Sequence, residues 1–165
     1  MAFVRTKKIG GKPYAYLVEN HWENGRARQT VTQYLGRVFE HQAATAGNAP
    51  DLSDHSFDEA VQALITHELL GLGFDKKEKT LVRESVVIDT TNWTVRNKNK
   101  PAVLKINNGY LCGHTAKQLI NFTPQEDEQA TGYALARKLV EAGLAVPQET
   151  FVKLFEKIQP KEAGQ

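Results

Sequence analysis

Residues 7–38 read KKIGGKPYAYLVENHWENGRARQTVTQYLGRV, a stretch rich in aromatic, basic and β-branched residues. Asn24-Gly25 separates two strand-like runs and readily takes the positive φ angles of a two-residue type I′ hairpin turn. Gly10-Gly11 marks an earlier turn. The stretch therefore predicts strands near residues 3–8, 14–21 and 26–34 that form a three-stranded antiparallel meander.

Alternation along these strands predicts which side chains share a face. Arg26 and Arg28 follow the turn two residues apart and point to the same side of the returning strand, and Arg5 and Lys7 have one parity on the first strand. On the second strand the residues of one parity are Tyr14, Tyr16, Val18 and Trp22. Aromatic side chains are also favoured in strands for packing alone, so at least half of the set Tyr14, Tyr16, Trp22 and Tyr34 is expected to pack rather than bind.

Charge is distributed unevenly, although the whole chain has a net charge of only +2. Residues 1–38 hold seven Lys and Arg against two Glu, and residues 39–75 hold seven acidic residues and no Lys or Arg. Residues 76–105 hold eight basic against three acidic residues. The two basic segments are expected to form one anion-binding face or, equally, ordinary solvated surface.

The rest of the chain predicts a second unit, which makes the protein an α+β fold. The expected order is a basic meander at residues 1–38, a linker at 39–55, an α+β domain at 56–160 and a frayed tail at 161–165. Ser56 and Glu59 form a capping box, so a helix begins there and ends near Gly71 or Gly73. A small β region follows between residues 81 and 106.

Three helices are expected to complete the second unit. The first spans about residues 110–122, the second begins at the N-cap Thr123 and runs to about 142, and the last opens at Pro147. Apolar stripes mark the last two helices, at positions that either close the fold or make a dimer: Leu135, Leu139, Phe151 and Phe155.

Motifs for catalysis, cofactors or metals are absent from the sequence. It has no phosphate-binding glycine loop, no Gly-x-Ser-x-Gly and no paired cysteines, and His67-Glu68 lacks the second histidine of a zinc site. We therefore expect a non-enzymatic protein without cofactor or metal. A weaker alternative is an enzyme that uses Asp89, His114 or Cys112.

Cysteine content and hydropathy favour a cytoplasmic protein. Cys112 is the single cysteine, which excludes an internal disulfide and suits a reducing compartment. No apolar run approaches the roughly 18 residues that span a bilayer, and residues 2–11 do not read as a signal peptide. We expect no membrane association.

One segment also resembles a known module. Phe3-Val4-Arg5, Tyr14 to Asn20, Gly25 to Gln29 and Tyr34-Leu35-Gly36 resemble the N-terminal β module of some prokaryotic insertion-sequence transposases and of small uncharacterised archaeal and bacterial proteins. The resemblance covers about the first 38 residues. It implies a shared binding module, whereas the RNase H-like domain that follows in those transposases has no counterpart here.

The combined expectation is a nucleic-acid-binding protein, with DNA and RNA both open. Its cations would neutralise phosphates, and two aromatic residues would stack on bases or pack beneath the cations. The candidate binding residues are Arg5, Lys7, Lys8, Lys12, Tyr16, Trp22, Arg26, Arg28 and Arg37. The alternative is a protein-interaction adaptor or accessory subunit of a larger ribonucleoprotein or protein assembly, with self-association through the C-terminal helices also open.

Overall fold

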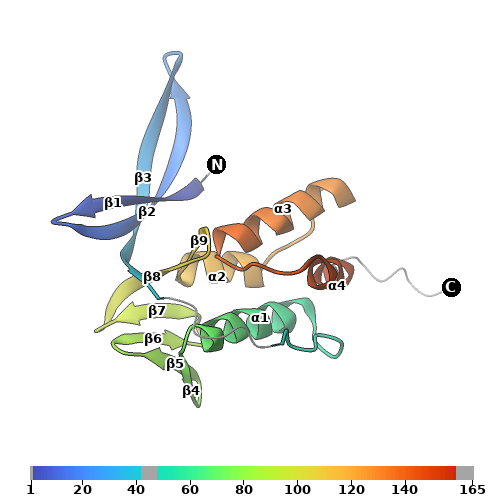
Figure 1. Ribbon diagram of the computed structural model, residues 1–165. Helices are drawn as coiled ribbons and strands as arrows, with labels where there is room; N and C mark the ends of the chain where they lie inside the picture. Colours follow the sequence, from blue (N-terminus) through green and yellow to red (C-terminus); the bar gives the residue numbers. More distant parts are fainter. Residues whose placement is uncertain (1, 42–47, 159–165) are drawn as a thin grey trace.

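The computed structural model describes residues 2–41 and 48–158 (Figure 1). The strands are β1 Ala2–Ile9, β2 Lys12–Glu23, β3 Arg26–Glu40, β4 Asp75–Lys77, β5 Thr80–Arg83, β6 Val86–Asp89, β7 Thr94–Asn97, β8 Lys100–Ile106 and β9 Gly109–Leu111. The helices are α1 Phe57–Gly71, α2 Gly113–Ile120, α3 Glu128–Glu141 and α4 Gln148–Ile158.

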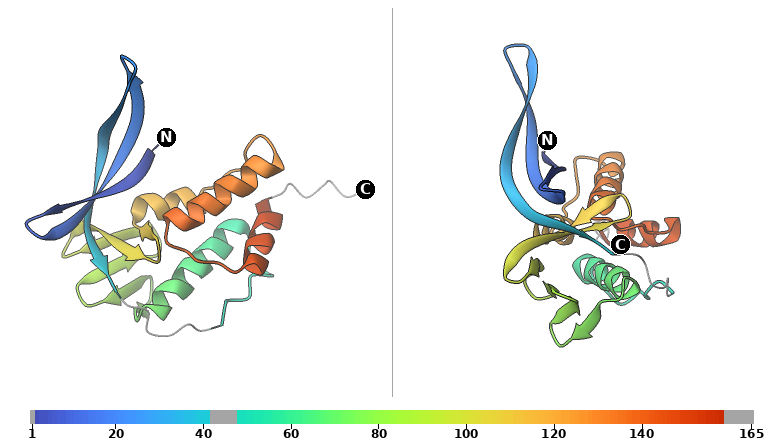
Figure 2. Two further views of the ribbon diagram at one scale, coloured as in Figure 1. Left: turned by 45° about the horizontal axis from the view of Figure 1, so that its top comes forward. Right: turned by 60° about the vertical axis from the view of Figure 1, so that its left-hand side comes forward.

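Within the described ranges the strands form one nine-stranded mixed sheet in the order β1-β2-β3-β8-β7-β6-β5-β4, with β9 paired to β8. Neighbours in this order are antiparallel except β3 and β8, whose residues Arg37–Glu40 and Ala102–Lys105 pair in parallel. This pair joins the N-terminal strands β1–β3 to the remaining strands of the sheet. The sheet curves strongly, and the helices lie together on one side of it (Figure 2).

The expected fold class, a three-stranded meander followed by a separate small β region, is therefore wrong. The N-terminal strands are longer than expected and continue into the nine-stranded sheet. Gly36 makes the junction possible, because a Cβ there would lie 2.3 Å from the Pro101 carbonyl oxygen. A parallel pair between residues more than 60 positions apart leaves no periodic signal in the sequence, since each strand's alternation is the same whichever partner it has.

Helices and sheet enclose the main core. Ile65 and Leu69 of α1, Leu119 of α2 and Leu135 of α3 are completely buried and belong to one apolar cluster with the inner residues of β5 to β9. We call strands β4–β9 and the four helices the body. A smaller cluster around Ala15, Leu17 and Cys112 packs the N-terminal strands onto it. In the C-terminal helices Leu135 and Leu139 are buried, and Phe151 and Phe155 pack against the main core.

Two helix starts were predicted from N-cap residues, and the structure confirms one of them. The capping box is confirmed: the Glu59 amide donates to Ser56 Oγ at 3.4 Å and the Ser56 amide to Glu59 Oε2 at 3.0 Å. The N-cap expected at Thr123 is wrong. The helix begins four residues later, where Asp127 Oδ1 accepts the Ala130 amide at 2.7 Å.

Part of the β2–β3 hairpin extends beyond the rest of the sheet. The last β1 pair joins Ala2 to Glu19, so residues 20–29 form a two-stranded ribbon with no third strand, which we call the arm. Apart from the two turn residues, every residue from Glu19 to Tyr34 lies in a strand and is exposed to solvent. Figure 1 shows the arm projecting away from the helices and the other strands.

The predicted division into a module, linker, second domain and tail stays a prediction. Linker positions 42–47 and the tail at 161–165 lie outside the described residues. In the ranges that the structure describes, no helix is long and apolar enough to cross a membrane.

Candidate nucleic-acid interface

The hairpin register decides which candidate residues lie together. Asn24 and Gly25 have φ angles of 52° and 75°, which confirms the predicted tight turn. It pairs Glu23 with Arg26 and His21 with Arg28, so both arginines lie on one face of the arm, which we call the arginine face. Trp22 pairs with Ala27 and Asn20 with Gln29 on the opposite face.

Nearer the body that opposite face carries tyrosines, and we call it the aromatic face. Lys7 pairs with Tyr14, and Arg5 with Tyr16. Its members are Arg5, Lys7, Lys12, Tyr14, Tyr16, Asn20, Trp22, Gln29, Tyr34 and Arg37. The predicted cations are consequently divided: Arg5 and Lys7 lie on the aromatic face, whereas Arg26 and Arg28 lie on the arginine face. Lys8, which pairs with Pro13, has the parity of the latter.

Tyr14, Tyr16 and Tyr34 form a cluster on the aromatic face. The Tyr34 ring centroid lies 5.4 Å from that of Tyr16 and 6.4 Å from that of Tyr14. Tyr34 is still 47% exposed. Desolvation, and to a lesser degree its two tyrosine neighbours, raises the pKa of Tyr34, so its hydroxyl stays protonated at neutral pH. The three rings therefore pack against one another while Tyr34 stays accessible to solvent.

Sequence reasoning grouped Tyr34 with the aromatic residues expected to pack, but it did not place Tyr34 opposite Tyr16. Two register shifts in the β2–β3 ladder, between Ala15 and Tyr16 and between Leu17 and Val18, bring Tyr34 opposite Tyr16. Such bulges add a residue to one strand and change which side chains face each other. The four β-branched or polar residues at 30–33 gave no sign of where the bulges would fall.

A row of polar side chains crosses the aromatic face at the start of the arm. Arg5 donates to Gln29 Oε1, and Gln29 Nε2 donates to Asn20 Oδ1 at 3.2 Å. Sequence analysis did not identify Asn20 or Gln29 as site residues. Amides at a strand pair are common surface residues, and their alignment with Arg5 depends on the twist of three strands.

The arginine face is only partly neutralised. Arg28 Nε lies 3.2 Å from Glu23 Oε2, and both side chains are more than half exposed. No ion pair involves Arg26 in the described residues. An exposed pair of this kind contributes little to folding and exchanges readily with other anions. Trp22, on the other side of the ribbon, is 78% exposed.

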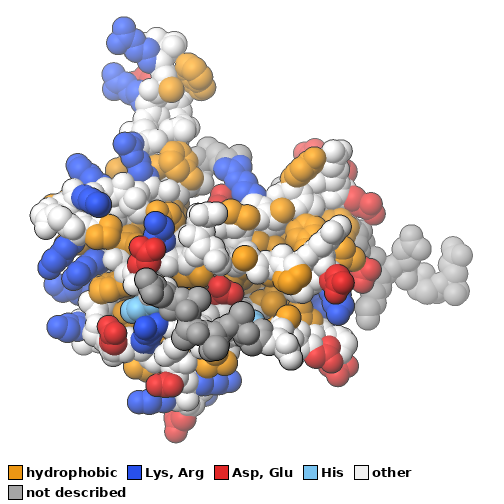
Figure 3. All heavy atoms as spheres, in the orientation of Figure 1, with side chains coloured by type: hydrophobic (Ala, Val, Ile, Leu, Met, Phe, Trp, Pro, Cys, Tyr) orange, Lys and Arg blue, Asp and Glu red, His pale blue; other side chains and the backbone are white. Residues whose placement is uncertain are grey.

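Basic side chains outside the arm are spread over several strands. Figure 3 shows Lys and Arg gathered over the arm and the strands on the left of the view. The β7–β8 turn, which carries Lys98 and Lys100, lies on the same side of the molecule as the β1–β2 turn (Figures 1 and 2). Lys76 and Lys77 lie on β4, the opposite edge of the sheet from β1. The second basic segment therefore does not form one patch.

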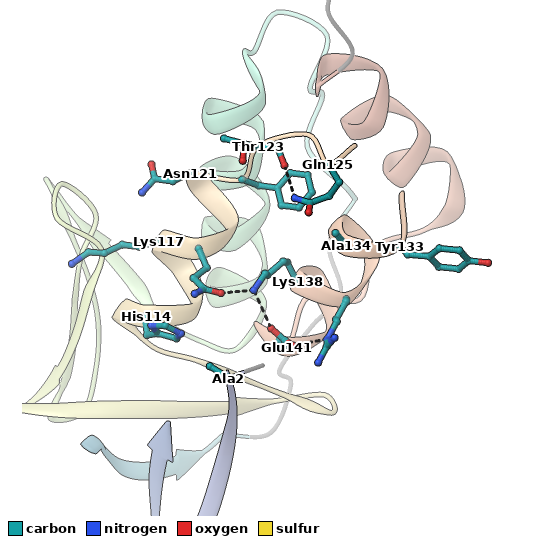
Figure 4. Close-up of a pocket in the computed structure, with 13 residues that line it drawn as sticks. Ala2, His114, Lys117, Asn121, Thr123, Gln125, Tyr133, Ala134, Lys138 and Glu141 are labelled. Carbon is teal, nitrogen blue, oxygen red and sulfur yellow. Dashed lines mark hydrogen bonds and ion pairs between the residues drawn. The ribbon is translucent and has the colours of Figure 1, made fainter. Parts of the chain in front are cut away.

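A hollow of about 750 Å³ lies between α2 and α3, next to Ala2 (Figure 4). Three of its charged side chains already have partners, namely Arg137, Lys138 and Glu141. Lys138 donates to Gln118 Oε1, and Arg137 Nε lies 3.0 Å from Glu141 Oε1. Burial, with a smaller effect of Lys138, lowers the pKa of His114, so its imidazole is neutral at pH 7.

Of the three residues of the enzyme alternative, Cys112 and His114 line one hollow and Asp89 lines another. Cys112 is buried, and desolvation raises the pKa of its thiol. The Asp89 carboxylate accepts the amides of Thr91 at 2.7 Å and Asn92 at 3.2 Å and so caps its own turn. These bonds lower the pKa of Asp89. Among the described residues no hydrogen bond joins the side chains of any two of Asp89, His114 and Cys112.

Residues 2–41 and 48–158 contain no group of three or more His, Cys, Asp or Glu side chains that could hold a metal ion. Comparison of the chain with protein-family models, curated proteins and solved structures gives no match. Function is therefore argued from the site itself.

Proposed function

We propose that this protein binds nucleic acid through the arm and the adjoining aromatic face. The observation that carries the proposal is the arm itself, a ribbon over residues 20–29 that is exposed on both sides and takes no part in the core. Folding does not require such an extension, because none of its side chains belongs to either apolar cluster. A binding role explains why the hairpin is longer than the strand that it pairs with.

The charges near the arm fit a polyanionic ligand. Arg26 and Arg28 lie two residues apart on one face, and Arg5 and Lys7 lie on the other near its start. Each cation that contacts a phosphate releases a condensed counterion, which favours binding at low salt. Glu23 opposes this attraction, so the arm is built for moderate and salt-sensitive affinity.

The aromatic residues have separate roles in this proposal. Trp22 is exposed and free to stack on a base or an unpaired end. Tyr14 and Tyr16 are half-buried and support Tyr34, whose exposed edge is available for contact. Arg37 lies over the Phe39 ring at 4.9 Å, so it is held beside the cluster rather than extended into solvent.

Fluorescence anisotropy tests the proposal directly. Labelled double-stranded DNA, single-stranded DNA and structured RNA are titrated with the full chain at two or more salt concentrations. We expect the affinity for at least one of them to fall steeply with salt. The double variant Arg26→Ala, Arg28→Ala should bind more weakly, and the magnitude of the slope of log K against log salt should fall by about 0.9 for each phosphate contact that is lost.

A charge-matched control separates the arm from general attraction. Lys76→Ala, Lys77→Ala removes the same charge from exposed positions on β4, the far edge of the sheet. This variant should keep the wild-type slope. Equal losses in both double variants, or no binding of any nucleic acid by the wild type at low salt, would contradict the proposal.

A second candidate is a protein partner on the outer side of α3. Tyr133 and Val140 lie seven residues apart on this helix and are 71% and 58% exposed, and Tyr133 also lines the hollow between α2 and α3. Exposed apolar side chains on one helix face are typical of protein contacts. Tyr133→Ala, Val140→Ala should then abolish recovery of the partner in pull-down experiments while Arg26→Ala, Arg28→Ala leaves it unchanged.

A further inference from the structure

The shape of the arm narrows the class of nucleic acid. A platform for single strands exposes one face, against which bases stack while the other face packs on the protein. The arm has no such packed side, since the residues of both faces are exposed from Asn20 to Gln29. A ribbon exposed on both sides is suited to lie between two walls of phosphate, which is what a duplex groove provides.

The dimensions of the arm match the major groove of B-form DNA. From Asn20 to the turn at Asn24 it reaches about 14 Å at about 3.4 Å per residue. The groove is about 12 Å wide and about 8.5 Å deep and accepts a two-stranded ribbon. In A-form RNA the major groove is too narrow and deep for side chains to read. Duplex DNA is therefore the better fit.

Arg26 and Arg28 lie at different distances from the tip of the arm, so they would reach different depths in the groove. Arg26 pairs with Glu23 directly beside the turn, whereas Arg28 is two residues, about 7 Å, further back on the same face. When the tip lies on the groove floor, Arg26 is level with the base edges and Arg28 is close to the phosphates at the rim. Arginine in that first position typically donates to N7 and O6 of guanine.

We propose that the arm enters the major groove of double-stranded DNA tip first, with Arg26 at guanine edges and Arg28 at a backbone phosphate. This inference rests on the proposed function and specifies its ligand. On the opposite wall the Arg5–Gln29–Asn20 row supplies polar groups near the rim, and Trp22 lies closer to the floor. Arg28 must exchange its Glu23 partner for the phosphate on binding.

The test uses one guanine-rich 20-base-pair sequence as duplex DNA, as single-stranded DNA and as duplex RNA, with the full chain. We expect at least about tenfold tighter binding of duplex DNA. A second DNA duplex replaces N7 of every guanine by carbon, which removes a major-groove acceptor and leaves base pairing and charge intact. This replacement should weaken wild-type binding about tenfold, the usual value of one good arginine–guanine contact.

Single variants separate the two arginines. Arg26→Ala should bind the normal and the N7-substituted duplex equally, whereas Arg28→Ala should still discriminate between them and have a salt slope lower by about 0.9. Tighter binding of single strands or duplex RNA, or wild-type indifference to the N7 replacement, overturns this inference but leaves nucleic-acid binding intact. Failure to bind any of the three overturns the proposed function as well.

Discussion

The arm and the helix-covered body differ in where their apolar side chains lie. In the body, α1, α2 and α3 place completely buried leucines and isoleucines against the sheet, so most apolar residues serve packing. In the arm, the tryptophan is almost fully exposed and polar side chains occupy both faces. Substitutions in the body should therefore change mainly the stability of the fold, and substitutions in the arm should change mainly the affinity for a ligand.

The largest effect is expected in the body. Leu119→Ala removes a completely buried side chain at the centre of the main core and should lower the free energy of unfolding by about 2–5 kcal/mol. Val31→Ala changes a side chain that is 59% exposed on β3, two residues beyond the arm, and should cost less than about 0.5 kcal/mol. Urea denaturation of both variants measures the contrast. Equal losses would show that the hairpin is part of the folding core.

The junction between the two regions should be the next most sensitive site. Gly36 has a φ angle of 130°, and a Cβ there would meet the Pro101 carbonyl, so Gly36→Ala should destabilise the protein by about 2–3 kcal/mol. Gly11→Ala is the matched control for positive φ, since nothing lies within 4 Å of its Cβ position. Thermal unfolding should rank Gly36→Ala well below Gly11→Ala. The reverse order would contradict the close pairing of β3 with β8.

A smaller effect of opposite sign is expected from Glu23. Glu23→Gln removes the acidic partner of Arg28 and one negative charge from the arm, so nucleic-acid affinity should rise about threefold, while stability changes by less than about 0.5 kcal/mol. Anisotropy at low salt measures the gain, and Glu149→Gln, on α4 in the body, serves as the control. Loss of affinity in Glu23→Gln would mean that the carboxylate itself contacts the ligand.

The smallest effect concerns pH and the body alone. Hydrogen bonds from Thr91 and Asn92 lower the pKa of Asp89 in the folded state. The stabilisation is therefore present above the ordinary Asp value of about 3.9 and is lost as the pH falls through the lower folded value. Asp89→Asn should be less stable than wild type at pH 6, and the gap should close in acid. A gap that is independent of pH would exclude this origin.

Local structure could be predicted from the sequence wherever the signal lies within a few residues. The Asn24-Gly25 turn and the Ser56–Glu59 capping box are confirmed, because turn geometry and capping depend on adjacent groups. The β region predicted between residues 81 and 106 does not specify the hairpin between β5 and β6, since Glu84 takes a φ angle of 52° without a glycine to indicate the turn. Asp127 replaced the expected Thr123 cap because both are good N-cap residues.

Long-range features could not be predicted in this way. The parallel pairing of β3 with β8 depends on a close approach at Gly36, and the sequence does not identify which strand meets that glycine. The site was predictable in part. Alternation placed Arg26 and Arg28 on one face, but the separation of these cations from Arg5 and Lys7, and the position of Tyr34, follow from the register and bulges of three paired strands.

Shortening the arm tests whether it binds nucleic acid without being needed for folding. Glu19 pairs with Thr30 just as Glu23 pairs with Arg26, so deleting residues 20–23 and 26–29 leaves Asn24-Gly25 as the turn and keeps every remaining side chain on its face. The measurement is nucleic-acid affinity alongside the urea midpoint. We predict an almost unchanged midpoint and loss of salt-dependent binding. A shortened protein that binds as tightly as the wild type, or one that no longer folds, would contradict the account.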